Sequence, residues 1–262
     1  MKRNTRASWI ACMLVGLLAA GALAEEASPL EAGVDLEFFS AYVWRGQVLS
    51  DRAVFQPGLT VSKWGFSVNA WSSMNLDGTD SDGEFTEMDW TVSYAHAVGL
   101  LELEVGFAEY TFPNTTDFVV VDDIETGVAL GGTREVFLAA GLDVLLSPTL
   151  TIVRDIDAVD GFYGSLSIGH SFELTERIGL ELSASLGAGD KDYNDAYFGY
   201  DKSALNDLVV GVSLPIAVTE FLSITPSAGY MVLPDSSLAD AGKDAYGKKE
   251  IVFGGVGLSV SF

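Results

Sequence analysis

The sequence has almost no cysteine. Cys12 is the only one in 262 residues, and it lies in an apolar stretch near the N-terminus. This stretch follows a basic start and precedes Ala22-Leu23-Ala24, so residues 1–24 are predicted to be a secretory signal peptide. The mature chain, 25–262, would then hold no thiol, which excludes disulfides, thiolate metal sites and a cysteine nucleophile.

Basic residues are also scarce. The chain holds 14 Lys and Arg against 37 Asp and Glu. Removing the signal peptide removes three basic residues and no acidic ones, so the mature balance is 11 against 37, or −26. Such a charge repels nucleic acid, which we exclude as a partner. Because 48% of the residues are hydrophobic, the chain is not disordered but must separate its acidic and apolar residues.

Beyond the signal peptide the sequence has no apolar run long enough for a membrane helix, and alternating polar and apolar residues replace it. Most alternating segments have ten to thirteen residues, close to the length of about 9–11 that a tilted strand needs to cross a bilayer. The predicted segments are 34–44, 53–63, 65–76, 86–98, 100–112, 134–144, 149–157, 162–173, 178–189, 207–218, 222–233 and 250–262.

The connections alternate between short turns and long polar loops, which is typical of an outer-membrane barrel with periplasmic turns and extracellular loops. Alternation alone also fits a soluble β-sandwich, but the strand lengths and the order of the turns favour the barrel. We therefore predict an all-β, transmembrane, antiparallel up-and-down β-barrel of about 12 strands in the cell outer membrane. Phe118–Val121, in the long segment 113–133, is a candidate extra strand and leaves the count open by two.

The chain ends on Phe262, at the end of an alternating strand. Its position on the predicted outward face fits the aromatic girdle of such barrels, and a terminal Phe resembles the assembly signal of bacterial outer-membrane proteins. We therefore expect the outer-membrane assembly machinery to be a partner through the C-terminal strand. Outer-membrane lipid and lipopolysaccharide are the other expected partners.

The face opposite the apolar one holds Ser, Gly, Thr and carboxylates. The carboxylates predicted to point inward are Asp35, Glu37, Asp89, Glu102, Glu104, Glu135, Asp143, Asp155, Asp157, Glu173 and Glu181. The residues predicted to line a pore are Glu37, Arg45, Trp71, Glu102, Glu104, Glu135, Asp155 and Glu181. Acidic rings favour cations, but a barrel interior filled with hydrogen bonds and ion pairs is the alternative. Arg45 is expected either to form a constriction with Glu37 or another carboxylate, or to tie the end of a strand.

The sequence offers little for catalysis or for metal binding. His96 and His170 are the only histidines, and both fall near predicted short turns, where an interfacial aromatic explains them. Asp80-Ser81-Asp82-Gly83 is a fragment of a calcium-loop spacing without the required glutamate, so a solvated acidic loop is favoured. We predict that the protein is not an enzyme and needs no metal or cofactor.

The region around the first loop resembles the TorF-like porin family. Members begin with a strand of the form S-x-Y-x-[FW]-R-G, followed by a polar loop and a second strand that carries Gln. The matching residues here are Ser40, Tyr42, Trp44, Arg45, Gly46 and Gln56. The resemblance implies a barrel through which small solutes diffuse.

From these features we expect a passive outer-membrane channel, monomeric or homo-oligomeric, for small solutes that are preferably cationic or neutral. The alternative is a non-conducting structural or adhesion barrel that presents acidic loops at the cell surface. A barrel enzyme is disfavoured by the positions of the two histidines.

Overall fold

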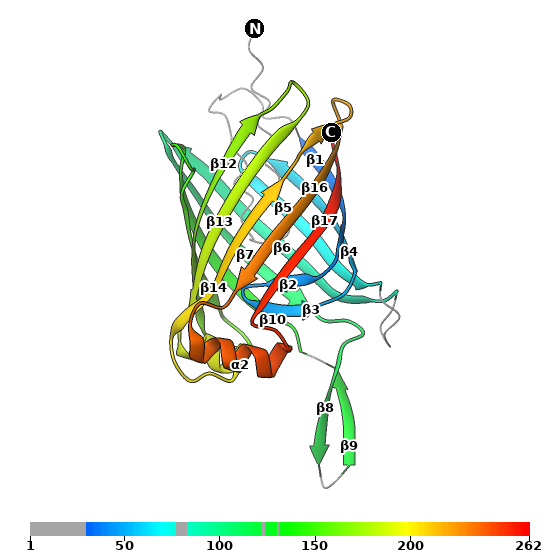
Figure 1. Ribbon diagram of the computed structural model, residues 1–262, viewed down its shortest axis with the longest axis vertical. Coiled ribbons are helices and arrows are strands. Elements are labelled where there is room, and N and C mark those ends of the chain that lie inside the picture. The colour runs from blue at the N-terminus through cyan, green and yellow to red at the C-terminus, as the bar shows by residue number, and fades with distance from the viewer. Residues whose placement is uncertain (1–29, 77–82, 122–123, 130) are drawn as a thin grey trace.

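Figure 1 shows a computed structural model of the chain, which describes residues 30–76, 83–121, 124–129 and 131–262. The predicted signal peptide with Cys12 lies outside the described residues, as does most of the calcium-loop fragment.

Twelve long strands pair in sequence order around a closed antiparallel ring. These strands are β1 (Glu31–Phe39), β4 (Val54–Lys63), β5 (Phe66–Asn75), β6 (Phe85–Val98), β7 (Leu101–Thr111), β10 (Thr133–Leu142), β11 (Thr149–Asp155), β12 (Phe162–Glu173), β13 (Gly179–Gly189), β14 (Ala204–Ser213), β16 (Leu222–Val232) and β17 (Glu250–Ser261). The ring closes because β14 pairs with β16 and β17 pairs with β1. A short strand, β15 (Ile216–Ala217), adds to β16. The prediction of an up-and-down barrel of about 12 strands is confirmed.

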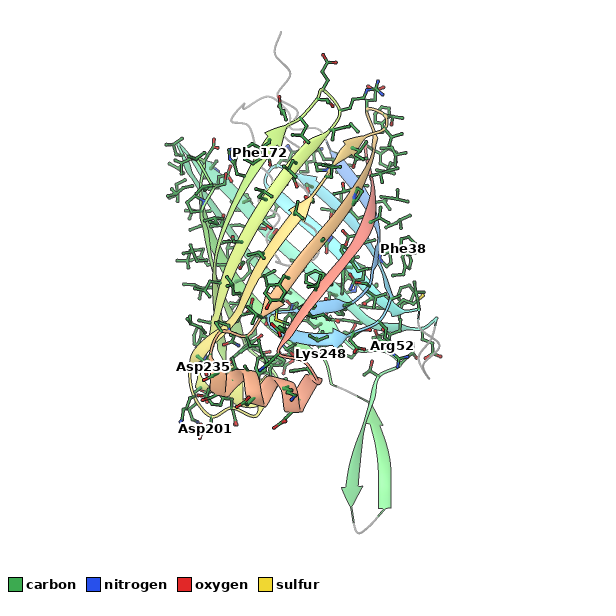
Figure 2. All side chains as sticks on the ribbon, viewed as in Figure 1. Phe38, Arg52, Phe172, Asp201, Asp235 and Lys248 are labelled. Carbon is green, nitrogen blue, oxygen red and sulfur yellow. The ribbon has the colours of Figure 1, made fainter. Side chains whose placement is uncertain are left out.

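The two faces of each strand differ because successive side chains point to opposite sides. On β7, Leu103 and Val105 are exposed on the outside, while Glu104 between them is buried inside. Phe38 points away from the barrel wall (Figure 2) and stacks on Phe55 of the neighbouring strand at 4.8 Å. An apolar outer wall around a polar interior is the arrangement of a barrel that faces lipid.

The two ends of the barrel differ in their connections (Figure 1). At the first, called here the terminal end, β1 begins, β17 ends and short turns such as Trp64-Gly65 join the strands. At the second, the loop end, lie α1 (Lys191–Phe198), α2 (Ser236–Tyr246) and a hairpin formed by β8 (Thr116–Val121) and β9 (Ile124–Ala129). Within the described ranges, neither helix is long and apolar enough to cross a membrane.

The candidate strand at 118–121 is real but does not join the barrel. Among the described strands, β8 and β9 pair only with each other, and their hairpin projects from the loop end (Figure 1).

The first predicted segment, 34–44, is wrong as a single strand. β1 stops at Phe39, where the backbone of Ser40 is bonded to Gly254 at 2.9 Å, and the chain then turns into the barrel. There β2 (Tyr42–Trp44) and β3 (Gln47–Ser50) form a hairpin, called here the inner hairpin. In the alternation of segment 34–44, Tyr42 and Trp44 share the outward face of Phe38, but because the chain turns at Ser40 they lie inside.

The inner hairpin provides apolar residues to a core at the loop end of the bore. This core also receives inward residues of the strands and residues of both helices. Its buried members are Phe39, Ala41, Val43, Val48, Val54, Phe137, Val153, Tyr163, Tyr193, Phe198, Val209, Met231, Leu233, Leu238, Ala239 and Phe253. The loop end is thus packed, whereas the inward positions toward the terminal end hold mainly Ser, Gly, Thr and carboxylates.

Candidate functional site

The turn of the inner hairpin places Arg45 in the bore. Arg45 and Gly46 both have positive φ, 48° and 85°, as a tight two-residue hairpin turn requires. A Cβ on Gly46 would meet the Leu233 side chain at 2.7 Å and Asp207 Cβ at 3.3 Å. Glycine at this position therefore allows both the turn and its close approach to the barrel wall.

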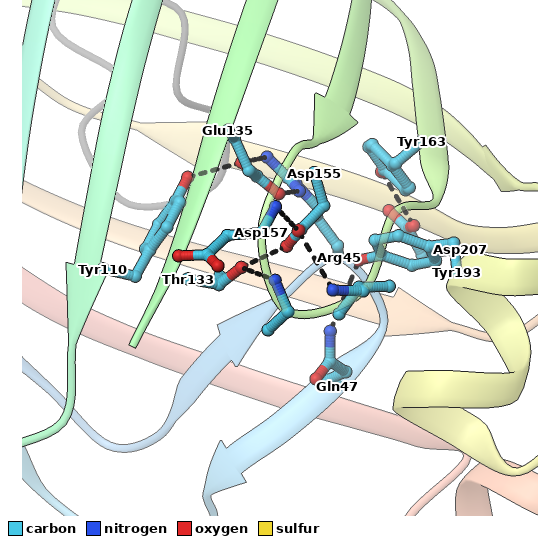
Figure 3. Close-up of polar contacts among 12 residues, drawn as sticks. Arg45, Gln47, Tyr110, Thr133, Glu135, Asp155, Asp157, Tyr163, Tyr193 and Asp207 are labelled. Atoms are coloured by element: carbon cyan, nitrogen blue, oxygen red, sulfur yellow. Dashed lines mark hydrogen bonds and ion pairs between the residues drawn. The ribbon is translucent and has the colours of Figure 1, made fainter. Parts of the chain in front are cut away.

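Arg45 forms a bidentate ion pair with Glu135 of β10 (Figure 3). The two hydrogen bonds measure 2.7 and 2.9 Å, and the side chains are only 7% and 2% exposed. The Tyr110 hydroxyl donates to Glu135 Oε2 at 2.8 Å. Two parallel charge-assisted hydrogen bonds fix the hairpin tip to the wall in both distance and angle.

Aromatic rings surround the Arg45 guanidinium. It lies 4.3 Å from the centre of the Trp44 ring and 4.9 Å from that of Tyr163. Burial alone would lower the pKa of Arg45, but the Glu135 carboxylate, Tyr110 and Tyr193 together raise it by more, so this pKa lies well above its ordinary value. The guanidinium remains charged, and the rings and carboxylate replace its water.

Asp155 forms its hydrogen bonds with Thr133 and with the adjoining β11–β12 loop. It accepts hydrogen bonds from the Thr133 hydroxyl at 2.5 Å and from the backbone N–H groups of Asp157 and Val159 at 2.9 and 3.1 Å (Figure 3). Its carboxylate therefore holds the β11–β12 loop in place.

The helices are tied to the inner hairpin through Gln47. The Tyr246 hydroxyl of α2 lies 2.7 Å from Gln47 Oε1 and 2.6 Å from the Tyr197 carbonyl of α1. Burial raises the pKa of Tyr246, so its hydroxyl keeps its proton and remains a donor. The Gln47 amide also donates to the Tyr193 hydroxyl at 3.4 Å. The inner hairpin and the two helices are thus linked by hydrogen bonds and together close the loop end.

The half of the bore nearer the terminal end is acidic. Ser259 donates to Asp35 at 2.6 Å, and Ser213 donates to Glu181 at 2.9 Å. Glu104 is 5% exposed, and its Oε2 is buried without a hydrogen-bond partner.

Basic residues are missing from this inner surface. The described strands carry three, namely Lys63, Arg134 and Arg154, and all lie at outward positions of their alternating strands. Arg134 pairs with Glu109, and Arg154 with Asp160, outside the bore. The inner wall therefore presents carboxylates without a basic side chain from the strands themselves.

The structure divides the eight residues predicted to line a pore into groups. Arg45, Glu135 and Asp155 lie at the packed loop end, where Trp71 also contacts Tyr42 with ring centres 5.5 Å apart. Toward the terminal end, Glu102, Glu104 and Glu181 occupy inward positions, and Glu37 lies between the groups on β1. Among the carboxylates considered as partners of Arg45, the structure pairs it with Glu135.

Three other carboxylates were predicted inward but are exposed at the ends of strands or in turns, where the barrel no longer encloses them. They are Asp143, Asp157 and Glu173. Phe262 is 72% exposed on the outside at the terminal end, and its N–H donates to the Ala32 carbonyl at 2.9 Å.

A bacterial protein family described as being of unknown function, Gcw_chp, matches residues 23–213. The chain belongs to the Gcw_chp family. This match neither names nor confirms the resemblance to TorF-like porins. No curated protein matches the chain.

Among solved structures, the NanC porin is similar to this Gcw_chp chain with 13% identity and a TM-score of 0.49, covering 88% of this chain and 98% of that one. An outer membrane channel from Pseudomonas putida F1 has 10% identity and a TM-score of 0.46, covering 91% and 97%. OmpT, an outer membrane protein of Vibrio cholerae, has 6% identity and a TM-score of 0.45, covering 89% and 97%. Because these TM-scores are below 0.5, the barrel fold is assigned from the closed ring of paired strands and not from these similarities.

Two buried carboxylates of this Gcw_chp member were missed in the sequence. Glu87 on β6 lies two residues before the inward Asp89, so the alternation already indicated it. Asp207 was placed at the start of a segment, whereas β14 begins at Ala204 and brings this carboxylate inside, where it accepts a hydrogen bond from Tyr163 at 2.9 Å. Among the described residues, no group of acidic or histidine side chains could hold a metal ion.

Proposed function

We propose that this Gcw_chp chain is an outer-membrane channel for the passive diffusion of small cationic or neutral solutes, closed at its loop end by the inner hairpin. The observation that carries this proposal is the acidic inner wall, in which none of the described strands places a Lys or Arg side chain inward. A bore lined by small hydroxyl residues and carboxylates leaves room for water and attracts cations.

The apolar outer wall supports a location in lipid, and the short turns support a periplasmic terminal end with an extracellular loop end. In this orientation the inner hairpin closes the extracellular mouth. The Arg45–Glu135 pair would act as the latch, because it holds the hairpin tip against the wall.

A second candidate is a non-conducting barrel that presents its loops at the cell surface. The observation that favours it is the packed core of the loop end, which contains residues of the inner hairpin and both helices. A barrel that is packed this completely at its loop end would not conduct solutes.

Single-channel recording of the mature protein in planar bilayers separates the two candidates. In the channel, Glu135→Gln removes the latch, and the open fraction rises several-fold above that of the wild type. The double variant R45M–E135M keeps the site free of an unpaired charge and should behave in the same way. Glu109→Gln, which breaks an exposed ion pair on the outer wall, is the matched control. If both latch variants fold and stay as silent as the wild type, the non-conducting barrel is correct.

A further inference from the structure

Three carboxylates of the bore recur at equal intervals around the barrel. Asp35 lies on β1, Glu104 on β7 and Glu181 on β13, all at inward positions. In the order of the ring these are the first, fifth and ninth of the twelve strands. They therefore divide the circumference into thirds.

The strand pairing also fixes their height in the bore. Following paired residues from Asp35 across β4, β5 and β6 leads to Tyr110 on β7, and Glu104 lies six residues before it, nearer the terminal end. The same path from Glu104 across β10, β11 and β12 leads to Gly187 on β13, and Glu181 again lies six residues before it.

The last third closes the circle. From Glu181 the paired residues lead across β14, β16 and β17 to Phe39 on β1, and Asp35 lies four residues before it. Because strands in a barrel tilt, a line of paired residues must climb by a constant amount per strand. Once around the ring, the line of paired residues climbs toward the loop end by the sum of the three offsets. Offsets of six, six and four residues are close to one third of this climb each. The three carboxylates therefore lie at nearly the same height in the bore.

Each of the three carboxylates has the same kind of support. A serine hydroxyl of the adjacent strand donates to it: Ser259 to Asp35, Ser93 to Glu104 and Ser213 to Glu181. A hydroxyl donor orients a carboxylate without cancelling its charge, so each carboxylate can accept further hydrogen bonds. The unpartnered Oε2 of Glu104 shows such unused capacity.

Other polar atoms of the bore also lack partners. Ser185, on the same face of β13 as Glu181, is 8% exposed, and its hydroxyl has no hydrogen-bond partner. The Thr225 hydroxyl of β16 is likewise buried without one. Buried polar groups without partners call for water or a ligand, since leaving them unpaired costs free energy.

We infer that Asp35, Glu104 and Glu181 form a ring that binds and selects hydrated monovalent cations and small organic ammonium ions on their way through the bore. Since the described carboxylates form no group that could hold a metal ion directly, the ring acts across water or through N–H donors of the solute. This inference rests on the proposed channel function and names the residues that give it its charge preference.

The test is the ratio of K⁺ to Cl⁻ permeability, read from reversal potentials in a KCl gradient. It uses R45M–E135M as the conducting background and adds D35N, E104Q and E181Q together. We expect the ratio to fall several-fold toward unity. The control adds Glu173→Gln, an exposed carboxylate at the terminal end, and should leave the ratio unchanged. If the protein with D35N, E104Q and E181Q added conducts with an unchanged permeability ratio, the ring inference is wrong while the channel proposal remains.

A binding measurement keeps the two proposals distinct. Titration calorimetry with spermidine, a small organic trication, is performed on the detergent-solubilised protein with and without the three substitutions. If no variant conducts but spermidine binding is lost with the three substitutions and kept with Glu173→Gln, the ring is a cation-binding site, while the channel proposal and selection during passage fail. If spermidine does not bind either protein and none conducts, both fail. Heat-modified migration on gels checks that each variant is folded.

Discussion

Arg45 and Glu135 meet inside the bore with almost no contact with water. Taking two charges out of water is costly, and their mutual attraction offsets that cost only while both are present. The exposed pair of Arg134 and Glu109 on the outer wall differs, because water and salt screen it. Breaking an Arg–Glu ion pair should therefore destabilise the barrel much more inside the bore than on the outer wall.

We predict that Glu135→Gln lowers the free energy of unfolding by about 3 kcal/mol, because it leaves a buried guanidinium without its counter-charge. Glu109→Gln should cost much less, because water and salt screen its exposed pair with Arg134. R45M–E135M should cost less than Glu135→Gln alone, since it removes both charges. Urea unfolding of the barrel in lipid vesicles measures all three. Equal losses for Glu135→Gln and Glu109→Gln would contradict the account.

Alternation in the sequence is sufficient to place individual carboxylates on the inner face. Glu104, Glu135 and Glu181 follow from the period of two alone. The partner of Arg45 does not, since Glu135 lies 90 residues further along the chain. That contact depends on where the hairpin tip lies in the finished barrel, which no local pattern records.

At the scale of elements, two hairpins of the loop end have opposite relations to the barrel. The inner hairpin of β2 and β3 lies within the core, whereas β8 and β9 project away from the ring (Figure 1). Only the first is in a position to block the bore.

Replacing residues 41–50 with two glycines should therefore produce a steadily conducting barrel with lower stability, because it removes both the closure and part of the buried apolar surface. Deleting residues 116–129 should leave conductance and unfolding unchanged. Planar-bilayer recording and urea unfolding test both deletions. A silent, folded barrel after removal of 41–50 would show that the inner hairpin is not the obstruction.

The two helices illustrate why loop structure is hard to predict. Their signals are present in the sequence: Asp190 and Asp235 cap the N-termini, and Gly199 and Gly247 end the helices at positive φ. Helices of 8 and 11 residues are nevertheless marginal alone in water. Their stability comes from packing on the inner hairpin and on each other, which polar loop sequences such as 189–206 do not reveal.

At the scale of the whole molecule, the barrel is closed by its first and last strands. β1 and β17 pair from Gly33 with Ser261 to Phe39 with Gly255, and the backbones of Ala32 and Phe262 exchange two further hydrogen bonds. This seam joins residues more than 200 positions apart, so the ring cannot close until β17 has been made. The prediction that an assembly factor recognises the unclosed chain through β17 can therefore be tested at this strand.

Phe262 allows this recognition to be separated from stability. Its ring is exposed on the outer wall at the terminal end, so removing it costs little packing, whereas an assembly factor that reads the terminal aromatic would lose its contact. We predict that Phe262→Ser lowers the amount of heat-modifiable barrel in outer-membrane fractions several-fold, while refolding of the purified chain into detergent micelles is unchanged. Phe221→Ser, which removes another exposed aromatic at the terminal end, is the matched control and should leave both measurements unchanged. If Phe262→Ser impairs refolding in micelles as much as assembly in cells, the residue stabilises the closed seam and does not act as a signal.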